Sequence, residues 1–140
     1  MKTITREWLN AAHDDLIAME VMNGREEITN MIAFHAQQAI EKSFKAVVEE
    51  FNLGKIKTHQ LESLYAKILH VISGFNETIL AELDTVYIEA RYPGDLGLMP
   101  HGKPSIEEAN IYYMEALRIK EQIEAFLTSN DLSATPKPIQ

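Results

Sequence analysis

The sequence has no cysteine among its 140 residues. Disulfides, thiolate metal ligands and a cysteine nucleophile are therefore excluded. No apolar run approaches the roughly 20 residues that a membrane-spanning helix needs, and the first residues, MKTITREW, lack the apolar core of a signal peptide. We expect a cytoplasmic protein without a membrane segment.

Basic residues are also few. The chain carries 13 Lys and Arg against 21 Asp and Glu, which gives a formal net charge of -8. A broad nucleic-acid surface needs clustered Lys and Arg that outweigh the acids nearby, so the composition argues against one. A small basic pocket stays compatible with this charge.

Helix breakers are rare and clustered. No proline precedes Pro93, and the glycines separate long stretches in which apolar residues recur every three or four positions, as on one face of a helix. The pattern predicts helices that end before Gly24, span about 27–52, run from Thr58 to before Gly74, run from about Asn76 to Tyr92, and run from Ser105 to about 127.

The helix starts carry recognisable caps. Thr58 is a good N-cap residue, and Ser105 with Glu108 has the spacing of a capping box. On the second helix, Gln37, Glu41 and Lys45 follow one another by one turn, away from the apolar stripe. We interpret the polar stripe of Gln37, Gln38, Glu41 and Lys42 as solvated or as facing a dimer partner, with ion pairs inside the helix.

The predicted fold is all-α, an up-down four-helix bundle with an additional fifth helix. Residues 1–127 form one domain, and residues 128–140 read as a flexible C-terminal tail. If the fifth helix returns antiparallel to the fourth, one pole of the bundle gathers several polar and cationic residues, with Lys45 about two turns away. These residues are Arg6, Thr58, His59, Arg91, Lys103 and Ser105.

Several motifs resemble those of the HEPN family of small helical bundles. They are Trp8 with Asp15 and Leu16, the block FHAQQAIEKSFKAVV at 34–48, THQL at 58–61 and ARYP at 90–93. The similarity covers roughly residues 5–127. It implies a bundle of four to five helices, commonly a homodimer, often encoded beside a minimal nucleotidyltransferase in a toxin-antitoxin-type pair. It also implies a nucleotide-binding role.

Many HEPN members are similar to metal-independent ribonucleases, in which an arginine is followed, after four to six residues, by a histidine. Counting from Arg91, that histidine would occupy position 96, 97 or 98, where this chain has Leu, Gly and Leu. The next histidine, His101, lies further on. The sequence therefore favours a noncatalytic binding module. The alternative is a ribonuclease toxin in which His101 is displaced and acts with Arg91.

A phosphate or nucleotide ligand, or a short RNA, would be held at the cationic pole. The candidate ligand-binding residues are Arg91, Tyr92, His59, Lys45 and Lys103. A planar guanidinium binds phosphate through two hydrogen bonds, but an internal carboxylate could occupy Arg91 instead. Glu49, Glu50 and Asp95 are the candidates for that role.

No metal site or other cofactor is expected, because the histidines are scattered and no Glu-x-x-His pair of the di-iron type occurs. His35 is more typical of a hydrogen-bonded core or interface histidine than of a metal ligand. Together with Met31 and Gln38 it lies on a face of the second helix away from the apolar stripe. We expect this face to form a homodimer.

Overall fold

The computed structural model describes residues 1–91 and 102–134, the side chains of residues 89–91 and 132–134 excepted. Helices account for its regular structure, and no strand occurs in these two ranges, so the all-α prediction is confirmed. The elements are α1 (Thr3–Met22), the 3-10 turn η1 (Glu26–Ile28), α2 (Thr29–Glu50), α3 (Leu61–Ile68), α4 (Glu77–Arg91) and α5 (Ile106–Ala134).

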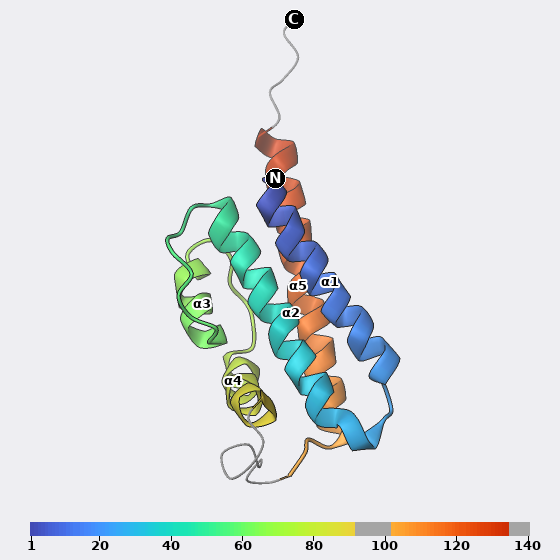
Figure 1. Ribbon diagram of the computed structural model, residues 1–140. Coiled ribbons are helices and arrows are strands. Elements are labelled where there is room, and N and C mark those ends of the chain that lie inside the picture. Colours follow the sequence, from blue (N-terminus) through green and yellow to red (C-terminus); the bar gives the residue numbers. More distant parts are fainter. Residues whose placement is uncertain (92–101, 135–140) are drawn as a thin grey trace, which may run out of the picture.

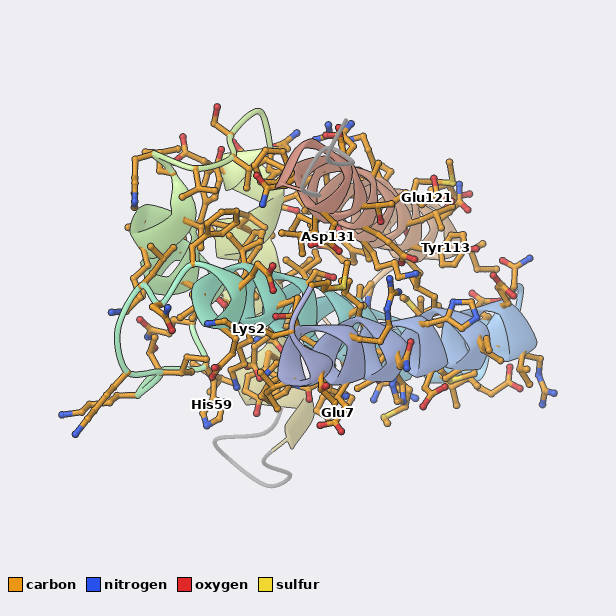
Figure 2. All side chains as sticks on the ribbon, turned by 90° about the horizontal axis from the view of Figure 1, so that it is seen from above. Lys2, Glu7, His59, Tyr113, Glu121 and Asp131 are labelled. Carbon is orange, nitrogen blue, oxygen red and sulfur yellow. The ribbon has the colours of Figure 1, made fainter. Side chains whose placement is uncertain are left out.

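Helix α2 is the centre of the fold and packs against each of the other four α-helices. The long helices α1, α2 and α5 lie side by side, while α3 and α4 cover the other flank of α2 (Figure 1). Helix α4 is seen nearly end-on in Figure 1 and lengthwise in Figure 2, so it crosses α2 instead of running along it.

The core fills the space between these helices with the apolar residues that the helical periodicity places inward. Phe44 of α2 is fully buried and stacks on Tyr65 and Phe75, with ring centroids 5.7 Å and 5.9 Å apart. Each fully buried side chain of this size stabilises the fold by about 1.5–3 kcal/mol. Other fully buried members include Leu9, Ile40, Leu64, Leu83, Ile119 and Ile123.

Helix α5 enters the bundle from the end opposite to the expected one. The hydroxyl of Thr29, the first residue of α2, donates to the carbonyl of Pro104 just before α5, over 2.6 Å. Figure 1 shows α2 and α5 starting at the same end, with α1 running the other way. Because α4 crosses α2, the simple up-and-down alternation ends before α5, and the prediction that the fifth helix starts beside the first is wrong.

Helix α3 begins later than predicted and is capped by another helix. It starts at Leu61, and the hydroxyl of Thr58 accepts from the Gln60 amide, so Thr58 is not its N-cap. The carboxylate of Asp84 in α4 accepts from the amides of Leu61 and Glu62, at 2.8 Å and 3.3 Å. A carboxylate on the first amides of a helix satisfies donors that have no partner within it.

Local side chains cap the starts of α4 and α5, and the capping box predicted for α5 is confirmed. Asn76 precedes α4, and its side-chain oxygen accepts from the amide of Ile79. Ser105 and Glu108 bond to each other's amides at 3.0 Å, which is the reciprocal pattern of a capping box.

The C-terminal end of α5 runs further than expected. The helix continues to Ala134, so residues 128–134, predicted to belong to a flexible tail, are helical. Asp131 pairs there with the N-terminal ammonium of Met1. None of the helices over the described ranges is both long and apolar enough to span a membrane.

Candidate functional site

The residues expected to share one cationic pole are spread over the bundle, with Arg6 at one end and Lys103 at the other. Arg6 pairs with Glu124 at 3.1 Å, in the C-terminal half of α5. The ammonium of Lys103 donates to the carbonyl of Glu27, beside the start of α2. Ser105 stays with Lys103 because it caps the start of α5. The prediction of a single pole is therefore wrong. It failed because α4 crosses α2, so that α5 starts at the other end of the bundle.

His59 lies beside the middle of α2, not beside its end. The segment between α2 and α3 folds back along α2, so the carbonyl of His59 accepts from the Gln37 side chain at 2.9 Å. The Nδ1 atom of His59 lies 3.3 Å from Glu41 Oε1. Figure 2 shows His59 on this outer segment, next to α2. Two predicted ligand residues, His59 and Lys45, are thereby brought to the same carboxylate.

That carboxylate belongs to a polar cluster in which Gln37, Glu41 and Lys45 are buried and His59 is exposed, and which we call the Glu41 network. Glu41 and Lys45 form an ion pair over 3.0 Å although their relative exposures are only 4% and 6%. The predicted ion pair within the helix is confirmed. The prediction of a solvated stripe is wrong at Gln37 and Glu41, which are buried because the segment returning from α2 covers them.

Trp8 closes the network from the side of α1. The ammonium of Lys45 lies 5.1 Å from the centroid of the Trp8 ring, within the range of a cation-π contact. The indole Nε1 is buried and has no hydrogen-bond partner among the described residues. Lys45 is thus enclosed by an anion and an aromatic face, and its charge is compensated within the fold.

A second polar cluster joins α1 to α2. Asp15 is 6% exposed, and its two carboxylate oxygens contact His35 Nδ1 at 2.8 Å and Lys42 Nζ at 2.7 Å. A carboxylate at Nδ1 orients the imidazole and directs Nε2 away from the pair. The expectation of a hydrogen-bonded histidine at His35 agrees with this contact. The role of Asp15 was missed because a lone acid in an apolar stripe does not reveal its partners.

The Asp15 cluster adjoins α4 through aromatic contacts. Phe34 meets the His35 ring edge-on at 5.3 Å and stacks on Tyr87 of α4 at 5.6 Å. Tyr87 stands one helical turn before Arg91, the last residue of α4. The end of α4 is thereby placed on the side of α2 that carries Phe34.

The remaining sequence predictions concern Arg91 and its neighbours. Tyr92 and His101 lie outside the described residues, as does Asp95, one expected competitor for Arg91. Glu50, another competitor, accepts instead from the amide of Lys2 at 2.9 Å and the hydroxyl of Thr5 at 2.8 Å. Glu50 thus serves the start of α1.

Within the described part of the chain, no group of three or more His, Asp or Glu side chains is arranged to hold a metal ion. The model of the HEPN domain family matches residues 5–127, which is most of the chain. The comparisons with curated proteins and with solved structures gave no match.

Proposed function

Because the chain belongs to the HEPN domain family, we propose that it is a noncatalytic binding module that works as a homodimer with a nucleotidyltransferase in a toxin-antitoxin-type pair. One observation carries this choice. The positions where a ribonuclease histidine would follow Arg91 hold Leu96, Gly97 and Leu98. Without an acid-base partner at that spacing, Arg91 lacks the group that would transfer a proton during RNA cleavage. A cytoplasmic location stays a prediction of the sequence.

The ion pairs favour a protein partner over a phosphate ligand. Glu41 contacts both Lys45 and His59, and Lys103 donates to the carbonyl of Glu27. A phosphate would have to displace these partners, and drawing Lys45 away would leave the buried Glu41 carboxylate without its counter-charge. A nucleotide-binding role is therefore retained for Arg91 and Tyr92 only.

The face proposed for the homodimer centres on His35. Met31, His35 and Gln38 are half-buried and follow one another along α2, next to the Asp15 cluster. In a two-fold dimer the same residues of both chains would meet, and an oriented imidazole can donate to or accept from its partner. Ile88, on α4 beside Tyr87, is 50% exposed and adds apolar area near this face.

A ribonuclease with a displaced histidine is the second candidate. It is favoured by the position of Arg91, which closes α4 directly before the segment that contains His101. This candidate and the binding module differ in what the purified protein does to RNA.

The test combines an RNA assay with a partner assay. Purified protein should leave single-stranded RNA intact, and its expression alone should be harmless to the host. A nucleotidyltransferase encoded by the neighbouring gene should form a complex of fixed stoichiometry with it in light scattering after size exclusion. RNA cleavage that is lost in both Arg91→Ala and His101→Ala, each folded, would replace the proposal by the ribonuclease.

A further inference from the structure

The helix ends opposite Met1 enclose a cavity that no part of the proposed function uses. It has a volume of about 160 Å³ and lies where α1 ends and where α2 and α5 begin. Its floor is apolar and consists of Met19, Ile32 and Ala109, which are 1%, 5% and 2% exposed. An apolar cavity of about 150 Å³ holds one benzene-sized molecule. The floor therefore fits a single six-membered ring.

The rim of the cavity is polar and comes from α1 and α5. Tyr113 of α5, labelled in Figure 2, reaches across to α1, and its hydroxyl donates to Glu20 Oε1 over 3.0 Å. Burial, reinforced by this hydrogen bond, raises the pKa of Tyr113, so the phenol stays neutral and keeps donating. The side chains of Asn23 and Asn110 add two amides to the same rim.

The electrostatics of the rim favour a cation. The dipole of α1 is negative at the cavity, but those of α2 and α5, which begin there, are positive, so the side chains decide which charge the rim favours. The last turn of α1, residues 19–22 (MEVM), supplies Glu20 and no basic side chain. Arg25 also lines the cavity, but its guanidinium is paired with Glu27 at 2.6 Å. The segments 19–32 and 103–113 carry more acids than bases, namely Glu20, Glu26, Glu27, Glu107 and Glu108 against Arg25 and Lys103.

We propose that this cavity binds a small organic cation, a protonated amine whose apolar body of about one ring rests on Met19, Ile32 and Ala109 and whose ammonium meets Glu20 at the rim. The Glu20 carboxylate has acceptor capacity beyond the one bond from Tyr113. The amide oxygens of Asn23 and Asn110 provide further acceptors for an ammonium, which carries three donors.

Three probes of one shape separate charge from apolar fit. Benzylamine, benzyl alcohol and benzoate would be titrated to about 20 mM, since a ligand of this size binds at about millimolar affinity. The side-chain amide signals of Asn23 and Asn110 in nitrogen-proton NMR spectra report the binding. Benzylamine should saturate with a Kd about ten-fold below that of benzyl alcohol, as one charge-assisted hydrogen bond implies. Benzoate should not bind.

Glu20→Gln keeps an acceptor for Tyr113 but removes the charge, so the amine should lose its advantage over the alcohol. Glu7→Gln is the matched control, because Glu7 is also exposed on α1 and lies about 20 Å along the helix. Ala109→Leu should fill the floor and weaken all binding. Equal Kd values for the amine and the alcohol in the parent protein, shifts that do not saturate, or an unchanged preference in Glu20→Gln would each overturn the site.

Discussion

The carboxylate of Glu41 lies 3.0 Å from the ammonium of Lys45, one turn further along α2, and both side chains are buried. A buried ion pair depends on both partners, because removing one leaves the other charge without water and without compensation. We expect Glu41→Ala to lower the free energy of unfolding by about 3–5 kcal/mol, as measured by urea denaturation.

The double variant Glu41→Leu with Lys45→Met should restore much of that loss, since two apolar side chains of similar size carry no uncompensated charge. Glu62→Gln, on the exposed side of α3, is the control and should change stability by no more than about 0.5 kcal/mol. A Glu41→Ala protein as stable as the control would show that Lys45 finds water or another anion.

Asp84 should make stability depend on pH in an unusual direction. Burial raises the pKa of Asp84 above its ordinary value of 3.8, against the opposing effect of the Leu61 and Glu62 amides. A raised pKa means that the folded state holds the proton more tightly, so stability from this residue falls as pH rises through the interval above 3.8. The variant Asp84→Asn has no titratable group at this position and therefore serves as the reference.

The stability of the parent minus that of Asp84→Asn should therefore decrease between about pH 3.5 and the raised pKa of Asp84, and be constant above it. Urea denaturation over this range measures the difference. A carbon NMR titration of the Asp84 carboxyl gives the pKa independently. A difference that grows with pH would mean that the two amides outweigh burial.

The proposed homodimer has a direct test. Light scattering at micromolar concentration should give twice the chain mass of 15.9 kDa. Gln38→Arg places a charge at the proposed two-fold face and should shift the mass toward that of one chain, because like charges from both copies would meet there. Gln60→Arg, on an exposed position before α3, should leave the dimer intact. A monomeric parent protein would rule out the dimer.

Arg91 is tested by comparing two substitutions. Loss of a purely surface contact with the helix dipole costs at most about 1 kcal/mol. If Arg91 uses its planar guanidinium, Arg91→Lys should lower either the melting temperature or the binding of a phosphate ligand nearly as much as Arg91→Ala does. We expect this result in a thermal-shift assay with nucleotides. If both variants have the melting temperature and the phosphate-ligand binding of the parent, Arg91 only contacts the helix dipole.

The sequence predicted the helices well because their apolar periodicity and their caps are local signals. Asn76 and the Ser105–Glu108 pair needed no knowledge of the rest of the chain. The start of α3 was misplaced because its cap, Asp84, comes from another helix. No pattern in residues 58–61 indicates that the carboxylate of Asp84, far along the sequence, caps this helix.

The candidate site was less predictable than the fold. Its assembly depended on the direction of α5, and the crossing angle of α4 that sets this direction is a property of packing between helices. The polar face of α2 was also misjudged. Whether Glu41 is solvated depends on the path of the segment after α2, which folds back far enough for His59 to reach it.

The capping of α3 by α4 has a consequence for local unfolding. A helix of eight residues is too short to persist alone in water, so α3 depends on Asp84 and on its packing against α2 and α4. Opening α4 would remove the cap and release α3 with it. The amide hydrogens of α3 should then exchange with solvent at the rate at which α4 detaches. Those in the middle of α2 should exchange only through global unfolding.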